Sequence, residues 1–330
     1  MTELLNIPGL AIGTRVDATF IVRDVDVRTQ ANGDPFTILT LGNATGTIGT
    51  EPFWTERSAE VAGLRRGHVV RALGEVATYR DRPQLRVVSL RHLPSDSVDF
   101  TTLLPSVGPV ERYWNTLDGW RREITKPRLR TAVDLFYEED VFRRQYEQCP
   151  GAVIGHHAVL GGLLKHTVEV AAIARTIAKA CGADLEIVMA GVLLHDIGKL
   201  EAYAWQGAFE HTERGRLLGH VALGALMLDR RLAEASPPVC TELERDILLH
   251  LVLAHHGRLE FGSPITPMTL EAEVIHWADN ASAKTESVAD VLRTDGNFSE
   301  GLVSQSQRML DYRRFWRGSS DWGDTSPNSS

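Results

Sequence analysis

The sequence predicts a two-domain protein in which a small all-β barrel is followed by an all-α domain. With 330 residues, of which 43% are hydrophobic and 24% charged, the chain is globular and long enough for two cores. Apolar residues alternate in short runs over about 14–93 and recur at helical spacing over about 110–316. Between these stretches, residues 94–109 hold three prolines among Ser, Thr and Asp.

Each predicted segment has its own signal. In the barrel, apolar runs lie at 16–22, 36–41, 68–73 and 85–88. Turn residues such as Asn32-Gly33-Asp34-Pro35 separate these runs, so about five short strands are expected. The helical domain contains Ala-rich stretches, and the last dozen residues are mostly Ser, Asp, Gly, Pro and Asn. We predict a barrel over 1–93, a linker over 94–109, a helical domain over 110–317 and a disordered tail over 318–330.

Charge is distributed unevenly between the two predicted domains. Residues 1–95 carry eleven Arg and no Lys against ten acidic residues, whereas the remainder carries 24 basic and 33 acidic residues. Within 57–91 there are eight Arg against three acidic residues. A basic stretch of this kind could hold a phosphate backbone, but a solvated strand face explains the charge equally well.

Cysteine content and hydropathy exclude other classes. The three cysteines are widely spaced and contain no CxxC pair, so neither a disulfide framework nor a cysteine-based zinc site is expected, and a reducing cytoplasm fits. No basic and apolar leader opens the chain. The longest apolar run, 187–194, is too short to span a bilayer, so we expect no membrane association.

Ten of the twelve histidines lie between residues 156 and 276, and an ordered set of ligand-type residues lies among them. Imidazole nitrogen together with carboxylate oxygen suits Zn, Mn, Fe, Co or Ni. Two such ions a few Å apart would stabilise the attacking and leaving oxygens of a phosphoester. The set therefore predicts metal-assisted phosphoester hydrolysis. Its members are His166, His195-Asp196, His220, His255-His256 and Asp279.

Spacing gives these residues different expected roles. His195 and Asp196 end an apolar helix, and Lys199 lies on the same side of the following turn. Lys199 is either a surface cation at a helix end or, as we expect beside a metal, a group that meets phosphate. Neighbours in a helix point about 100° apart, so His255 and His256 are not expected to share one ion. His256 is then a substrate contact or a group behind the ligands.

Lone histidines on apolar helices are more often hydrogen-bonded core residues. For this reason we leave His250 and His276 out of the predicted site.

At these residues the chain resembles a known superfamily. The pattern of His166, His195-Asp196 and Asp279, with HDIGK at 195–199, resembles the HD-domain metal-dependent phosphohydrolases. Longer strings are similar to the YhaM-type 3′→5′ exoribonucleases over roughly 12–315. The strings are NGDPF (32–36), YRDRPQLRV (79–87), GHHAVLGGLLKHTVEV (155–170), GVLLHDIGKL (191–200), EHTERGRLLGHV (210–221) and AHHGRLEFGSPITPMTLEAEVIHWADNASAK (254–284).

This resemblance implies a fold, an activity and a ligand set. An OB-fold would precede an HD domain, and the activity would be Mn- or Co-dependent removal of nucleotides from the 3′ end of single-stranded RNA, in some members DNA. His166, His195, Asp196 and Asp279 match the ligands of the first metal site. His220 and His255, with Asp196 bridging, match those of a second. Lys199 matches the lysine that contacts phosphate.

One missing motif narrows the resemblance, and two positions depart from the family pattern. The GYP signature of the cyclic-dinucleotide phosphodiesterases is absent, which argues against that branch. After Asp279-Asn280 the family tends to place another Asp, whereas this chain has Ala281-Ser282. Residues 46–49, Gly-Thr-Ile-Gly, break the pattern expected of the barrel.

Single-strand recognition is assigned to the barrel, whose sheet can combine Arg charges with aromatic stacking surfaces. Aromatic residues on such a barrel are also commonly core residues, which is the competing interpretation. His157 and His256 are predicted substrate contacts in the helical domain. The barrel candidates are Phe36, Trp54, Tyr79, Arg80 and Arg86.

Two other functions stay open from the sequence. One is a phosphohydrolase of free nucleotides or short oligonucleotides, in which the barrel mediates assembly. The other is a non-catalytic nucleic-acid-binding regulator, which the intact ligand set opposes. Self-association, the native metal and the choice between RNA and DNA are left open by the sequence.

Overall fold

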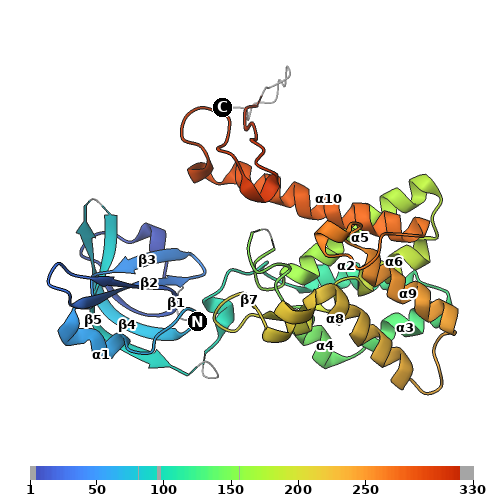
Figure 1. Ribbon diagram of the computed structural model, residues 1–330, viewed down its shortest axis with the longest axis horizontal. Coiled ribbons are helices and arrows are strands. Elements are labelled where there is room, and N and C mark those ends of the chain that lie inside the picture. The colour runs from blue at the N-terminus through green and yellow to red at the C-terminus, as the bar shows by residue number, and fades with distance from the viewer. Residues whose placement is uncertain (1–4, 81, 95–97, 156, 320–330) are drawn as a thin grey trace.

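The computed structural model describes residues 5–80, 82–94, 98–155 and 157–319. Figure 1 shows a β-barrel at one end of the molecule and a group of packed helices at the other. This is the predicted fold class. The predicted disordered tail falls, from residue 320 onward, outside the described residues.

The barrel is a single sheet closed on itself in the order β1-β2-β3-β5-β4. Strands β3 and β5 pair in parallel, and all other neighbouring strands are antiparallel. A closed five-stranded barrel of this kind is the OB-like architecture expected from the sequence. The strands are β1 (Arg15–Thr29), β2 (Pro35–Asn43), β3 (Gly46–Thr50), β4 (Val69–Tyr79) and β5 (Arg82–Leu93), with the short helix α1 (Ser58–Val61) before β4.

Strand β1 is long because it pairs with two neighbouring strands along different parts of its length. Its first half pairs with β4, for example Phe20 with Val70, and its second half pairs with β2. An irregularity between Val22 and Asp24 marks the change, as a β-bulge does when a strand bends around a barrel. Alternate side chains such as Leu39 and Leu41 fill the interior.

The expectation that residues 46–49 break the barrel pattern is wrong, because they form most of β3. Ile48 and Thr50 point inward and are buried. Gly46 lies against Pro8, whose side-chain atoms would come within 3.2 Å of an added Cβ. The two glycines hide the alternation of this short strand, although one of them is needed for close approach.

The helical domain packs around α6, whose last seven residues are all buried. That burial explains why the sequence of α6 is apolar on every side rather than amphipathic. Its contacts with α5, α10, α3 and α9 place its C-terminal end among the other helices. The helices are α2 (Glu111–Arg122), α3 (Pro127–Tyr137), α4 (Asp140–Tyr146), α5 (Gly162–Cys181), α6 (Leu185–Leu194), α7 (Lys199–Ala202), α8 (Glu213–Glu234), α9 (Glu242–Ala254) and α10 (Leu270–Arg293).

The expectation of a purely helical second domain needs one correction. Two strands of two residues each, β6 (Tyr203–Ala204) and β7 (Glu210–His211), form a small hairpin before α8. Strands this short leave no periodic signal in a sequence. In Figure 1 the hairpin lies between the helices and the barrel.

The hairpin and residues 98–109 lie where the two domains meet. Leu103 and Leu104 are buried in a cluster with Ile21 and Val69 of the barrel. At the tip of the hairpin, Gly207 packs so closely on Gly67 that an added Cβ would lie 2.1 Å from the Gly67 carbonyl oxygen. Among the described residues, no helix is both long enough and apolar enough to cross a membrane.

Candidate metal centre

The predicted ligands come together where the ends of several helices meet. His166 lies on α5, His195 and Asp196 follow the last residue of α6, and Asp279 lies on α10. His220 comes from α8, and His255 and His256 follow α9. Residues up to 113 positions apart are thus brought to one buried point.

Asp196 is the centre of this arrangement, and its two carboxylate oxygens face different histidines. Oδ2 lies 3.2 Å from Nε2 of His195 and 3.5 Å from Nε2 of His166. Oδ1 lies 3.4 Å from Nε2 of His220 and 3.7 Å from Nε2 of His255. A carboxylate placed in this way can bridge two cations, each with its own pair of imidazoles.

Unsatisfied polar atoms test whether the residues fit a metal. The Nε2 atoms of His195, His220 and His255 are buried and have no hydrogen-bond partner within the described part of the chain. Leaving such atoms unpaired is costly, and a cation would satisfy all three. Asp279 completes the set, since its Oδ1 lies 3.0 Å from Nε2 of His166. The nitrogen and oxygen donors therefore fit divalent transition metals.

Two of the imidazoles are aimed by the ends of the helices that carry them. The Nδ1 of His195 donates to the Val192 carbonyl oxygen at 2.7 Å, and that of His255 donates to the Val252 carbonyl oxygen at 2.6 Å. Each bond fixes the tautomer and turns Nε2 toward Asp196. Free carbonyls in the last turn of a helix make this possible.

Helix α8 is interrupted beside its own ligand. Gly219 has φ 73° and ψ 155°, which separates two helical segments that run into one another in sequence. Positive φ favours glycine, and the next residue, His220, begins the second segment with its side chain toward the cluster.

Burial favours the neutral form, which a metal ligand needs, in three of the four imidazoles around Asp196. The exception is His195, where burial is outweighed by the Asp196 charge, so its pKa is raised. Burial lowers the pKa of His220 to about 3, and it lowers the pKa of His255 well below the ordinary value. Burial also lowers the pKa of His166, although the hydrogen bond with Asp279 opposes the change.

Lys199 forms a buried ion pair with Asp196. Its Nζ lies 2.6 Å from Asp196 Oδ2 and donates to the Gly151 carbonyl oxygen at 2.7 Å. Burial lowers the pKa of Lys199, but the Asp196 charge more than offsets this, so the pKa is raised. Burial likewise opposes ionisation of Asp196, yet Lys199 and His195 hold its pKa well below the ordinary value. With two partners already, the lysine acts first on Asp196, and its contact with phosphate stays a prediction.

Sequence reasoning missed two residues that support His166. The Nδ1 of His166 lies 3.1 Å from the Ser282 hydroxyl, which donates to Glu169 Oε2 at 3.1 Å. Ser282 stands in the segment where the resembling family tends to place another Asp, so a hydroxyl and a carboxylate together orient the ring here. Their spacing in the sequence could have indicated this role. Glu169 lies three residues after His166, and Ser282 lies three after Asp279, so each shares a helix face with a ligand.

His157 lies behind His166 instead of facing open space. Its side chain is only 1% exposed, and its Nε2 lies 2.9 Å from Glu169 Oε2. The structure therefore gives this residue a place in the support of His166. It also lines a cavity of about 330 Å³, and its contact with substrate stays a prediction.

The expectation that His255 and His256 do not share one ion stays a prediction, although the two side chains lie close together. Helix α9 ends at Ala254, His255 keeps helical dihedral angles, and the chain turns at Gly257 with φ 75°. The two rings lie 4.3 Å apart between centroids, and potential ligand atoms of His220, His255 and His256 lie within 4.8 Å of one another. The two histidines that were left out of the predicted site have main-chain partners. His276 bonds the His255 carbonyl, and His250 accepts from the Met268 amide.

A cavity of about 250 Å³ adjoins the cluster, and it shares two residues with it. The lining residues are His256, Phe261, His276, Asp279, Asn280, Ala283 and Lys284.

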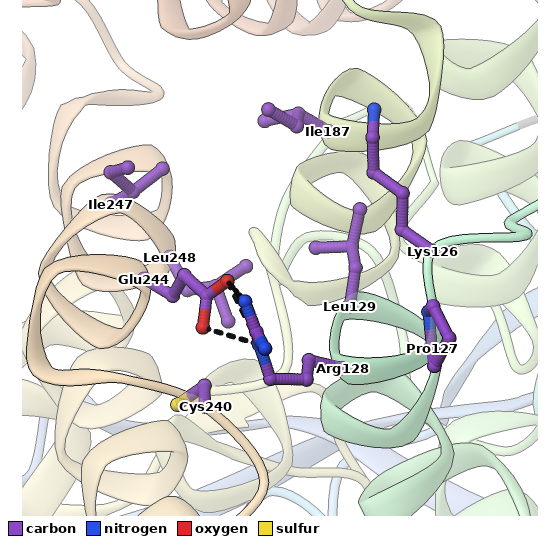
Figure 2. A pocket seen from close by; sticks show the side chains of 9 residues that line it. All are labelled: Lys126, Pro127, Arg128, Leu129, Ile187, Cys240, Glu244, Ile247 and Leu248. Carbon is purple, nitrogen blue, oxygen red and sulfur yellow. Dashed lines mark hydrogen bonds and ion pairs between the residues drawn. The ribbon is translucent and has the colours of Figure 1, made fainter.

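A second cavity, of about 360 Å³, lies between α3, α6 and α9 and contains none of the candidate ligands (Figure 2). Its walls are largely apolar, including Leu129 and Ile187. The cations at its rim are already paired, as Figure 2 shows for Arg128 with Glu244 at 2.6 Å. The cavity that adjoins the candidate ligands is smaller, at about 250 Å³.

On the barrel, the predicted aromatic contacts lie at the surface. The rings of Phe36 and Trp54 lie in tilted contact with centroids 5.0 Å apart, and Trp54 is 41% exposed. Tyr79 is 59% exposed, and the Arg80 guanidinium lies 5.2 Å from its ring centre. The competing interpretation of these rings as core residues is thus wrong for Trp54 and Tyr79. Arg86 is engaged by Glu51, at 3.1 Å.

Part of the helical domain matches a known domain family. Residues 163–284 match the family model for the HD domain. The helical unit is therefore an HD domain, a metal-dependent phosphohydrolase domain, and here it follows a five-stranded barrel.

The particular resemblance extends over almost the whole chain. This chain is 27% identical to the 3′-5′ exoribonuclease YhaM of Bacillus subtilis over 305 residues. The aligned region covers 91% of this chain and 95% of that protein. This chain is 29% identical to the protein of the same name from Shouchella clausii, covering 93% and 95%. The protein of that name from Oceanobacillus iheyensis is also 29% identical, covering 91% and 94%. The resemblance inferred from the sequence motifs is confirmed.

Proposed function

We propose that this protein is a metal-dependent 3′→5′ exoribonuclease that shortens single-stranded RNA from its 3′ end. The observation that carries the proposal is the position of Asp196, with one pair of histidines at each of its oxygens. The similarity of this chain to YhaM exoribonucleases, which extends over both domains, supports the choice of RNA as substrate.

The proposal includes ligand sets for two cations, which the arrangement of the side chains supports. His166, His195, Asp196 and Asp279 would hold the first. Asp196 with His220 and His255 would hold the second, and His256 is within reach of it. Mn is the metal we expect, and Co, Fe, Ni or Zn also suit this donor set.

The side chains of the protein prepare the site for hydrolysis. Lys199 keeps Asp196 ionised, and the Nδ1 bonds of His195 and His255 keep their Nε2 atoms available as donors. When bound, divalent cations supply hydroxide near neutral pH and neutralise charge on the phosphate oxygens. Water is then the nucleophile, and no separate nucleophilic side chain is required.

In this proposal, residues 1–93 bind nucleic acid and residues 110–317 catalyse hydrolysis. Trp54, in contact with Phe36, and Tyr79 offer exposed ring surfaces to unpaired bases, and Arg80 adds a nearby cation. Arg86 is already paired with Glu51, so its contribution to binding is smaller. Single-stranded DNA is included as a substrate, and self-association is compatible with the proposal. The unpaired cysteines suit the reducing cytoplasm that we propose as the location.

The test is digestion of a 5′-labelled single-stranded RNA by metal-stripped protein, with and without added Mn²⁺, resolved at single-nucleotide length. A ladder that shortens from the 3′ end only with metal is the expected result. Intact RNA together with hydrolysis of dinucleotides would replace the proposal with a phosphohydrolase of small substrates. Binding of RNA without hydrolysis of either substrate would favour a non-catalytic regulator.

A further inference from the structure

The cavity beside the metal centre is placed to hold part of the substrate. It contains Asp279, from the first ligand set, and His256, which lies beside the second. A molecule in this cavity therefore touches both halves of the cluster. With a volume of about 250 Å³ the cavity is smaller than the roughly 300–1,000 Å³ of most ligand pockets, so it suits one ring and its sugar better than a longer segment.

One wall of the cavity is an exposed aromatic ring. Phe261 is 51% exposed and ends the short 3₁₀ turn Leu259–Phe261. Its main-chain carbonyl oxygen accepts a hydrogen bond from Nδ1 of His256 at 2.7 Å. The backbone of this turn is thus fixed to the metal centre, whereas the ring itself is not needed for that bond. An exposed ring held at the edge of an active site is a stacking surface for a base.

The opposite wall supplies polar groups from α10. Asn280 and Lys284 are four residues apart, so both lie on the face of the helix that lines the cavity. Lys284 is half-exposed, and its ion pair with the exposed Asp311 is long, at 4.0 Å. Unlike Lys199, whose ammonium group is enclosed by two partners, Lys284 can turn toward a phosphate.

We propose that this cavity receives the 3′-terminal nucleoside of the RNA, with its base stacked on Phe261 and its polar groups facing Asn280 and Lys284. This inference rests on the proposed function. Stacking accepts every base, so the subsite would favour the presence of a base without selecting its identity. Phe261 then positions the last phosphodiester over the metal centre.

The test compares two single-stranded RNAs that differ only in the 3′-terminal residue, which is a normal nucleotide in one and lacks its base in the other. Wild-type protein, Phe261→Ala, Phe261→Trp and Leu259→Ala are measured with Mn²⁺ for kcat/KM on removal of that residue. Phe261→Ala keeps the carbonyl that orients His256. Leu259 is exposed on the same turn and does not line the cavity, which makes its variant the matched control.

The wild-type enzyme is expected to prefer the normal end by about 5- to 150-fold, the range that stacking of one base gives. Phe261→Ala should lose most of this preference by slowing only on the normal end, while Phe261→Trp and Leu259→Ala keep it. Equal slowing of Phe261→Ala on both RNAs, or no effect on either, would overturn the subsite. Failure of the wild-type enzyme to shorten either RNA would instead remove the proposed function, and the subsite with it.

Discussion

At the scale of single residues, the buried Asp196–Lys199 pair explains how a carboxylate stays charged among four imidazoles. Both partners are almost inaccessible to water, and each holds the pKa of the other away from the neutral form. Removing one member of such a pair leaves an uncompensated buried charge, which typically costs about 3–5 kcal/mol. Asp196→Ala would therefore combine loss of activity with loss of stability.

Asp196→Asn is the milder variant because it keeps the shape of the side chain, although Lys199 again loses its counter-charge and some stability is lost with it. We expect hydrolysis to fall by more than about 100-fold, since even groups that merely support metal ligands contribute about 10–100-fold. Binding of single-stranded RNA to the barrel should persist. Turnover with Mn²⁺ and RNA affinity in a gel-shift experiment measure the two effects. Full activity in this variant would contradict the metal mechanism.

Ser282→Ala tests the support of His166. The substitution removes the hydroxyl that joins Nδ1 of His166 to Glu169, so the ring loses its fixed orientation. Affinity for Mn²⁺, measured by titration of activity, should fall about 10- to 100-fold. Thr285→Ala is the matched control, because Thr285 bonds only the main chain of its own helix in the described structure. If both variants bind Mn²⁺ like the wild type, Ser282 has no positioning role.

At the scale of elements, the ligands are delivered by helix ends more than by helix faces. His195-Asp196 and His255-His256 each follow the last residue of a helix. There the backbone has free carbonyls and can turn, so adjacent side chains reach places that a continuous helix would separate. The sequence pattern identified these residues, but it could not show where each helix stops.

A link between α3 and α9 fixes the far end of α9. The Arg128 guanidinium bonds both oxygens of Glu244 (Figure 2). Glu244 also closes a capping box with Thr241. These bonds lower the pKa of Glu244 from its ordinary 4.5 to about 2, with Arg128 the largest cause. A carboxyl whose pKa is lower in the folded protein stabilises it above the unfolded value. This stabilisation is complete above about pH 4.5 and is lost as the pH falls toward 2.

Glu244→Gln should therefore lower the Tm at pH 7, by about 1–4 °C for a largely exposed pair, and the difference from wild type should shrink as the pH falls below 4.5. Thermal unfolding followed by circular dichroism at several pH values measures this. Glu242→Gln, in the same helical turn, is the control. A difference that stays constant from pH 7 to pH 3 would show that the charge of Glu244 is not responsible.

At the scale of the whole molecule, the division of labour between the domains predicts an effect of substrate length. Trp54→Ala removes an exposed ring from the barrel while leaving the metal centre untouched. We expect about 5-fold or greater weakening of binding to long single-stranded RNA and unchanged hydrolysis of dinucleotides. The control is Val88→Ala, another exposed apolar residue of the barrel. Equal losses on long and short substrates would place Trp54 outside RNA recognition.

The two-domain order and the gathering of the ligands were predictable because periodicity and residue chemistry are local properties of a sequence. The third strand was not, since its glycines hide the alternation around Ile48. Nor was the support of His166 by Ser282, because that bond depends on how α5 packs against α10. The joint between the domains, where Gly207 meets Gly67, likewise depends on contacts across the chain and leaves no pattern in either segment.

The break at Gly219 determines how His220 is held. Because the two segments of α8 are separate helices, His220 stands in the first turn of one of them, and an added Cβ on Gly198 would lie 2.0 Å from its carbonyl oxygen. The orientation of this imidazole therefore depends on two glycines that lie far apart in the sequence. One supplies the positive φ before His220, and the other allows the main chain of the HDIGK turn to pack against it.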